Sequence, residues 1–240
     1  MIPKIIHYCW FGRGEKPKKI QECINSWYQH LSDYQIIEWN EDNFDVNKLQ
    51  YTKDAYDAKK YAFVSDVARV KALYEMGGIY LDTDVMVYKS FNEVLNHSCV
   101  LGFEMGNYVA TSMMACEPKY PLMKEFYDLY MNIKFYDENG NIISGTNVLK
   151  LTNMLLNKGL KRNNQFQVID NDIAIYPQAY FSPYDYGYEI RNNTNETICE
   201  HLFLVSWLPW NKKIKRNLKK ILVYICGERL SRKIYKKYFL

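Results

Sequence analysis

Residues 61–87 read YAFVSDVARVKALYEMGGIYLDTDVMV, a helix pattern followed by two glycines, a short apolar strand and two acids. The helix is predicted by apolar residues at three- and four-residue spacing, as one buried face requires: Val64, Val67, Ala68, Leu73 and Tyr74. Gly77-Gly78 ends it, because glycine tolerates the positive φ that a helix C-terminus commonly needs. Ile79–Leu81 then forms a strand, and Asp82-Thr83-Asp84 follows where the strand ends. We expect the rest of the chain to be arranged around this unit.

The two acids after the strand predict a metal site. Side chains alternate along a strand, so Asp82 and Asp84 project to the same side if the extended conformation continues. Two converging carboxylates repel each other unless a cation lies between them. Mg²⁺ or Mn²⁺ prefers oxygen ligands and keeps positions open for phosphate. The alternative is a solvated Asp-Thr-Asp turn, which an isolated D-x-D sequence usually is; the helix, glycines and apolar strand before it favour the metal.

The ordered pattern S-D-x-x-R…G-G-x-Y-x-D-x-D resembles the signature of glycosyltransferase family 32. This family includes the yeast initiating mannosyltransferases and many bacterial capsule and O-antigen transferases, and the segment is similar to the core of the clostridial glucosylating toxins. The resemblance implies a single α/β domain of the A-type nucleotide-sugar glycosyltransferase fold, a Rossmann-like mixed sheet flanked by helices. It also implies transfer of a hexose with retention of the anomeric configuration.

The resemblance assigns roles within this stretch. Asp82 and Asp84 become catalytic residues of the metal site: Asp84 binds the ion directly, and Asp82 reaches it through water or binds the ribose. Arg69 becomes a catalytic residue that orients the donor and stabilises the negative charge of the leaving group. Ser65, Asp66 and Tyr80 are placed at the donor sugar. Asp66 and Arg69 suit a polyol, since a carboxylate accepts hydrogen bonds and a guanidinium donates them. A surface ion pair between these two residues, three apart on a helix, is the open alternative.

The N-terminal sequence predicts a βαβ unit. Residues 4–11 form an apolar strand, residues 20–31 a helix with an inner face, and residues 34–39 a second strand. Ligands bind beyond the carboxyl ends of such strands, so Trp10 is expected on the same rim as the acids. By resemblance, Trp10 of Trp10-Phe11-Gly12 stacks on the nucleotide base; a core tryptophan is the alternative. His7 is expected to be a core histidine.

Later elements are predicted from apolar runs and periodicity. Strands are expected at residues 100–104, 111–115 and 173–177, and helices at 122–133 and 148–157. The segment TICEHLFLVSWLPW, residues 197–210, has a histidine followed by Ser-Trp, as the family commonly does. The resemblance places His201 near the metal as a third ligand, and Ser206 and Trp207 at the donor diphosphate. A structural histidine and a core tryptophan remain the alternatives.

Charge divides the chain at residue 210. Residues 211–240 contain eleven lysines and arginines and one glutamate, a net charge of +10; since the whole chain is +4, residues 1–210 carry −6. We therefore expect a transferase domain over 1–210 and a basic amphipathic helical tail over 211–240, suited to an anionic membrane surface. A solvated helix packed on the body is the alternative. No nucleic-acid-binding module is recognisable.

The cysteines and termini point to the cytosol. The six cysteines show no C-x-x-C pair, so they are expected to be reduced and mostly buried thiols. No signal peptide or bilayer-length apolar run is visible, so a cytoplasmic protein, peripheral on the inner face of the cell membrane, is predicted.

These patterns and the resemblance predict an enzyme that moves a hexose from UDP- or GDP-hexose to a glycan, with Mn²⁺ or Mg²⁺ as cofactor. The expected acceptor is lipid-linked, in capsule or O-antigen synthesis. A non-catalytic carbohydrate- or membrane-surface-binding protein on the same fold is the alternative. A metal-dependent nucleotidyltransferase is the third hypothesis, but it requires a glycine-rich triphosphate loop, which Gly12-Arg13-Gly14 only faintly resembles.

Overall fold

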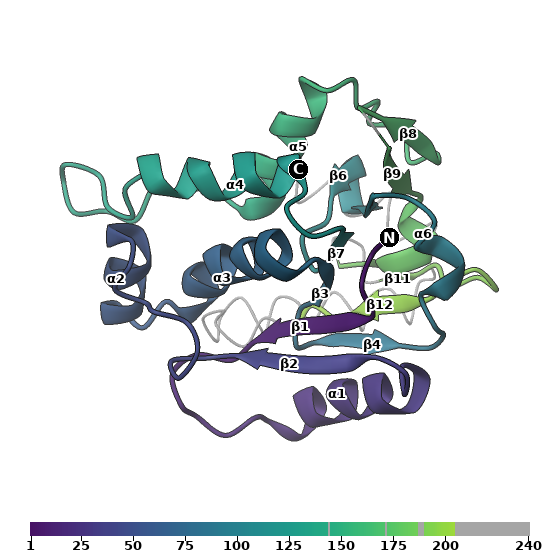
Figure 1. The fold of residues 1–240 in the computed structure, drawn as a ribbon, viewed down its shortest axis with the longest axis horizontal. Coiled ribbons are helices and arrows are strands. Elements are labelled where there is room, and N and C mark those ends of the chain that lie inside the picture. Colours follow the sequence, from purple (N-terminus) through teal and green to yellow (C-terminus); the bar gives the residue numbers. More distant parts are fainter. Residues whose placement is uncertain (144, 171, 187–189, 205–240) are drawn as a thin grey trace, which may run out of the picture.

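The computed structural model describes residues 1–143, 145–170, 172–186 and 190–204. Within them the chain forms a mixed α/β body around a central sheet, which confirms the predicted fold class (Figure 1). The strands of this sheet are β1 (Ile5–Cys9), β2 (Gln35–Trp39), β3 (Gly78–Leu81), β5 (Cys99–Glu104), β6 (Tyr108–Val109), β7 (Met113–Cys116), β8 (Gln167–Ile169) and β9 (Ile173–Tyr176). Four short strands lie outside it: β4 (Val85–Val87), β10 (Tyr184–Asp185), β11 (Ile190–Arg191) and β12 (Cys199–His201).

The helices cover both faces of the sheet. They are α1 (Lys18–His30), α2 (Gln50–Asp57), α3 (Tyr61–Met76), α4 (Pro121–Asn132), α5 (Asn147–Leu156) and α6 (Gln178–Phe181), with short 3-10 turns η1 (Asn92–Val94) and η2 (Met105–Asn107). One buried cluster joins α2, α3, α4 and α5 to the sheet, and a second joins α1, α6 and the β4–β12 pair to the opposite face. Figure 1 shows α1 and α3 on opposite sides of β1.

The strand order is β2-β1-β3-β7-β5-β9-β8, with β6 paired to β5. β1 runs parallel to β2 and β3, as the predicted βαβ unit requires. β7 is antiparallel to both of its neighbours, β3 and β5, so β3 and β5 run in the same direction. The carboxyl ends of β1, β2, β3 and β5 therefore meet at one edge of the sheet, which we call the carboxyl rim.

The local predictions around the central unit are confirmed. α3 ends at Gly77, whose φ is +64°, a value that a residue with a side chain rarely adopts. The strands predicted at 100–104 and 173–177 and the helices predicted at 122–133 and 148–157 are all present, with ends shifted by a few residues; the strand predicted at 111–115 begins at Met113. His7 is fully buried between Gly77 and Trp39, as expected of a core histidine.

Five of the six cysteines, at 9, 23, 99, 116 and 199, lie in the described part of the chain as free, buried thiols, as predicted. Among the described helices, none has the length and apolar character needed to cross a bilayer. The expected basic tail, together with Ser206 and Trp207, lies outside the described residues.

Candidate active site

The acids after β3 lie in a tight turn at the carboxyl rim. The N–H of Val85 donates to the carbonyl of Asp82 (3.0 Å), closing a turn over residues 82–85. The N–H of Asp82 donates to the backbone carbonyl of Ser112 (2.8 Å), which connects the turn to the start of β7. Asp82 and Asp84 therefore converge as predicted, but the cause differs from the prediction. A turn, and not a continued extended strand, brings the two carboxylates together.

Beyond the turn the chain leaves the central sheet and pairs with a distant segment. β4 is antiparallel to β12, with Val85 opposite His201. The buried Trp27 of α1 donates from its indole nitrogen to the carbonyl of Val85 (2.8 Å) and fixes the start of β4. This pairing carries His201 to the acids, although more than a hundred residues separate them in the sequence.

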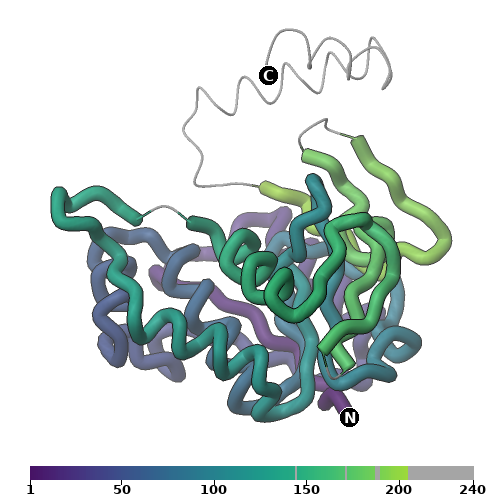
Figure 2. Tube along the Cα trace, turned by 90° about the horizontal axis from the view of Figure 1, so that it is seen from above, coloured from purple at the N-terminus to yellow at the C-terminus, as the bar shows by residue number. Residues whose placement is uncertain are grey.

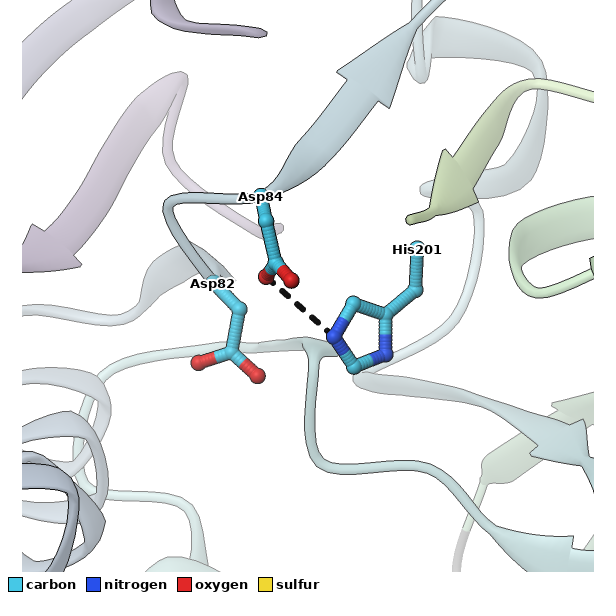
Figure 3. Close-up of side chains that lie close together, drawn as sticks. All are labelled: Asp82, Asp84 and His201. Atoms are coloured by element: carbon cyan, nitrogen blue, oxygen red, sulfur yellow. Dashed lines mark ion pairs between the residues drawn. The ribbon is translucent and has the colours of Figure 1, made fainter. Parts of the chain in front are cut away.

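Asp82, Asp84 and His201 form a three-residue cluster whose ligand atoms lie within 4.8 Å of one another. The three side chains point toward one another (Figure 3). His201 Nε2 lies 3.2 Å from Asp84 Oδ1, and its other ring nitrogen, Nδ1, is buried without a hydrogen-bond partner among the described residues. Two carboxylates and an imidazole fit a divalent cation such as Mn²⁺.

The segment after β12 also forms hydrogen bonds with Asp84. The N–H of Leu202 donates to the backbone carbonyl of Asp84 (3.0 Å), and the N–H of Leu204 donates to its Oδ2 (2.9 Å). Burial would raise the pKa of Asp84, but His201 and the Leu204 N–H outweigh it and hold that pKa below its usual value. Burial would likewise lower the pKa of His201, and the Asp84 carboxylate instead raises it to about 8. The two partly exposed side chains thus favour each other's charged form.

Arg69 joins the signature helix to the acids. Its side chain is only 6% exposed, and Nη2 lies 3.1 Å from Asp66 Oδ1 and 3.2 Å from Asp82 Oδ1. Nη1 donates to the carbonyl of Thr111 (2.7 Å), and the guanidinium lies 4.5 Å from the centre of the Tyr80 ring. The Asp66–Arg69 pair is therefore buried, so the alternative of a surface ion pair is wrong.

Burial sets the protonation of Asp66. It raises the pKa of this carboxyl to about 6; Arg69 opposes the increase, and Asp82 adds to it. Asn147, at the start of α5, donates to the backbone carbonyl of Asp66 (3.3 Å). The end of α3 that carries Asp66 is thus held between the carboxyl rim and α5.

Two residues predicted at the donor form hydrogen bonds within the protein. Tyr80 is 1% exposed, and its hydroxyl donates to Asp82 Oδ1 (2.9 Å) below the guanidinium of Arg69. The hydroxyl of Ser65 donates to the carbonyl of Tyr61 in the same helix (3.1 Å). These contacts make Tyr80 a support for Asp82, and Ser65 a partly buried neighbour of the Asp66–Arg69 pair.

Trp10 follows β1 on the same rim, partly exposed, as predicted. Its indole nitrogen donates to the carbonyl of Gly14 (2.6 Å). Gly12 has a φ of +93°, and a side chain there would collide with the ring of Tyr61 (2.3 Å). Glu41 accepts from the Gly12 N–H (2.6 Å) and from the Tyr56 hydroxyl (2.9 Å), which anchors the turn that carries Trp10.

The sequence interpretation missed one acid on this rim. Glu104 is the last residue of β5 and is 8% exposed. Burial raises the pKa of its carboxyl group to about 7; His201 lowers this pKa and Asp82 raises it further. It also missed the backbone groups of Thr111 and Leu204. An acid at a strand end looks the same in sequence whether it is solvated or buried, and backbone groups leave no sequence signal.

Residues 17–101 match the family model described as "Glycosyltransferase sugar-binding region containing DXD motif". This segment therefore resembles a DXD glycosyltransferase region. The match covers about a third of the chain and contains Asp66, Arg69, Asp82 and Asp84. It agrees with the predicted glycosyltransferase class, and the finer assignment to family 32 stays a prediction. A relative, "Uncharacterized protein At4g19900" of Arabidopsis thaliana, is 30% identical over 123 residues, which are 50% of this chain and 18% of that protein.

Several solved glycosyltransferases also resemble this chain. One is described as involved in glycosylation of the major capsid of PBCV-1 (9% identity, 91% of this chain and 100% of that one, TM-score 0.48). Another is the galactosyltransferase LgtC, in complex with donor and acceptor sugar analogs (11% identity, 91% and 94% of the two chains, TM-score 0.47). A third, the PaToxG glycosyltransferase, is 20% identical over 53% of this chain and 60% of that one, with a TM-score of 0.43. All three TM-scores are below 0.5.

Proposed function

We propose that the chain is a metal-dependent, retaining glycosyltransferase that moves a hexose from a nucleoside-diphosphate sugar to a glycan acceptor. The observation that carries the proposal is the convergence of Asp82, Asp84 and His201 within 4.8 Å, on the rim that also bears Trp10. The match of residues 17–101 to a DXD glycosyltransferase region supports it.

Each residue has a role in this proposal. Asp82, Asp84 and His201 hold Mn²⁺ or Mg²⁺, which supplies positive charge to the departing diphosphate. Trp10 binds the base, and Asp66 and Arg69 orient the donor sugar. Tyr80 and Arg69 hold Asp82 in place, since one donates a hydrogen bond to its carboxylate and the other pairs with it. Ser206 and Trp207 are proposed to contact the diphosphate.

The direct test is metal-dependent hydrolysis of a panel of UDP- and GDP-hexoses by the full chain. A glycosyltransferase releases nucleoside diphosphate in the presence of Mn²⁺ or Mg²⁺ and stops when the ion is chelated. A non-catalytic binding protein releases none, and a nucleotidyltransferase releases pyrophosphate. Absence of nucleoside diphosphate across the panel would contradict the proposal.

Replacing Trp10 with alanine is expected to weaken donor binding. Stacking of a base on an aromatic ring contributes about 1–3 kcal/mol, so the KM for the nucleotide sugar should rise roughly 10- to 100-fold with a smaller change in kcat. Steady-state kinetics of hydrolysis measure both constants. Trp10→Phe is the matched control, because it keeps an aromatic face and should retain most of the affinity. An unchanged KM in Trp10→Ala would place the base elsewhere.

We further propose that the acceptor is a lipid-linked oligosaccharide in capsule or O-antigen assembly, built at the cytoplasmic face of the membrane. The support is the net charge of +10 over residues 211–240, which suits an anionic lipid surface. Membership of glycosyltransferase family 32, which includes many bacterial capsule and O-antigen transferases, would agree with this acceptor.

Charge reversal in the tail is expected to release the protein from anionic vesicles. In the full chain, Lys212, Lys213, Lys219 and Lys220 would be replaced by glutamate. Each basic residue near such a surface contributes about 1 kcal/mol, so binding should fall by more than about 100-fold. Co-sedimentation with phosphatidylserine-containing vesicles measures it, and neutral phosphatidylcholine vesicles are the control. Equal sedimentation of the variant and the wild type would count against a membrane role.

A further inference from the structure

Glu104 is a buried acid with no hydrogen-bond or ion-pair partner for its carboxyl group in the described part of the chain. It is the last residue of β5 and is 8% exposed, so more than nine-tenths of its surface is covered. Through its backbone it pairs with Tyr108 of β6. Buried carboxyl groups are normally paired or hydrogen-bonded, because an unpaired one costs free energy. An unpaired carboxyl beside an active site is therefore available to a ligand.

The position of Glu104 on the rim is defined by the sheet. β5 runs in the direction of β3, with β7 between them, so Glu104 and Asp82 lie at the same edge. β1, with Trp10 at its end, lies on the other side of β3. Along the carboxyl rim the order is therefore Trp10, then the acids of the cluster, then Glu104. Figure 2 shows the last described residues, 190–204, at the end of the molecule opposite Met1.

The side chain of Glu104 projects toward the layer that carries His201. Alternation along β5 puts Glu104 on the same face as Gly102, and a side chain on Gly102 would lie 2.5 Å from the ring of Phe181 in α6. The thiol of Cys199 in β12 donates to the carbonyl of Phe181, so α6 and β12 belong to one layer. The influence of His201 and Asp82 on the pKa of Glu104 agrees with this placement.

Glu104 nevertheless lies outside the candidate ligand set. Asp82, Asp84 and His201 are the group whose ligand atoms converge within 4.8 Å in the described part of the chain, and Glu104 is not in it. In the proposed function the base lies on Trp10 and the diphosphate at the cluster, so the nucleotide would occupy the β1 side of the rim. That arrangement leaves the side where β5 ends to the sugar that receives the hexose.

We propose that the carboxylate of Glu104 binds a hydroxyl group of the acceptor sugar and so fixes the acceptor beside the reacting carbon. The inference rests on the proposed glycosyltransferase function. A sugar hydroxyl donates a hydrogen bond and a carboxylate accepts one, and hydrogen bonds to charged groups are stronger than neutral ones. Glu104 is thus a specificity residue for the acceptor, separate from the residues that hold the ion and the donor.

The test compares hydrolysis with transfer in the full chain. Both reactions use Mn²⁺ and a nucleotide hexose that the wild type hydrolyses. In hydrolysis the acceptor is water, and in transfer the acceptor is a methyl hexoside from a panel. Glu104→Gln should hydrolyse the donor within about twofold of the wild-type rate, at the same half-saturating Mn²⁺ concentration. Its KM for the methyl hexoside should rise at least about tenfold, because the charged hydrogen bond is lost. Glu104→Asp keeps the charge on a side chain that is one methylene shorter. Its KM for the methyl hexoside should therefore lie between that of the wild type and that of Glu104→Gln.

Glu117→Gln is the matched control. Glu117 directly follows β7, which runs antiparallel to β3 and β5, so it lies at the opposite edge of the same sheet. Glu117→Gln should leave both hydrolysis and transfer unchanged. An equal loss of hydrolysis and transfer in Glu104→Gln would overturn the inference, as would an unchanged hexoside KM. A wild type that hydrolyses donor but transfers to none of the hexosides would overturn it too. A wild type that hydrolyses no nucleotide sugar would instead refute the proposed function itself.

Discussion

Asp84→Asn should abolish metal binding and lower turnover by more than about 100-fold, because it removes the charged oxygen that faces both His201 and Asp82. The amide keeps the size of the carboxylate and still offers an oxygen to the Leu204 N–H, so the turn should persist. His201 loses the neighbour that raises its pKa, and burial then favours the neutral imidazole. The variant should therefore fold while failing to bind the ion.

Two readouts separate these effects. Mn²⁺ binding is followed by the electron paramagnetic resonance signal of the free ion, without any substrate, and folding is followed by circular dichroism during thermal unfolding. Asp33→Asn is the matched control, since Asp33 is a half-exposed acid paired with Lys4 just before β2, at the opposite edge of the sheet. Wild-type activity in Asp84→Asn, or unchanged Mn²⁺ affinity, would refute the metal assignment.

Residues 61–87 could be interpreted well from sequence because the information there is local. The apolar spacing defines α3, Gly77 supplies the left-handed residue that ends it, and the strand follows at once. The convergence of Asp82 and Asp84 was also predictable, but not its cause. Both a turn and a continued strand can bring the carboxylates of an Asp-x-Asp sequence to the same side. The hydrogen bond from the Val85 N–H to the Asp82 carbonyl shows that this chain forms a turn.

Long-range pairing set the limit of the sequence interpretation. Residues 85–87 have the pattern of another strand of the central sheet, and nothing local shows that they pair instead with β12. His201 could be placed near the metal only by resemblance. Likewise, an aspartate and an arginine three residues apart look the same on an exposed helix and on a buried one. The packing of α3 against β3, which brings Asp82 to Arg69, decides between them.

Arg69→Met should lower the free energy of unfolding by roughly 3–5 kcal/mol, the usual cost of removing one partner of a buried ion pair. The methionine fills similar space, so little of the loss comes from a cavity. What remains is two partly buried carboxylates, Asp66 and Asp82, without their shared counter-charge, and a Thr111 carbonyl without its donor. Lys71→Met is the control: Lys71 lies on the same helix in a more exposed pair with Glu75, whose loss should cost at most about 1 kcal/mol.

The pH dependence separates a lost counter-charge from a simple packing defect. Because the pKa of Asp66 is raised from 3.8 to about 6 by burial, the folded state binds more protons than the unfolded state between these values. Stability from this group is therefore present at low pH and is lost as the pH rises through about 6. Without Arg69 the folded pKa rises further, so the loss grows and extends to higher pH. Urea unfolding should show a larger deficit for Arg69→Met at pH 8 than at pH 5, whereas a packing defect would give the same deficit at both.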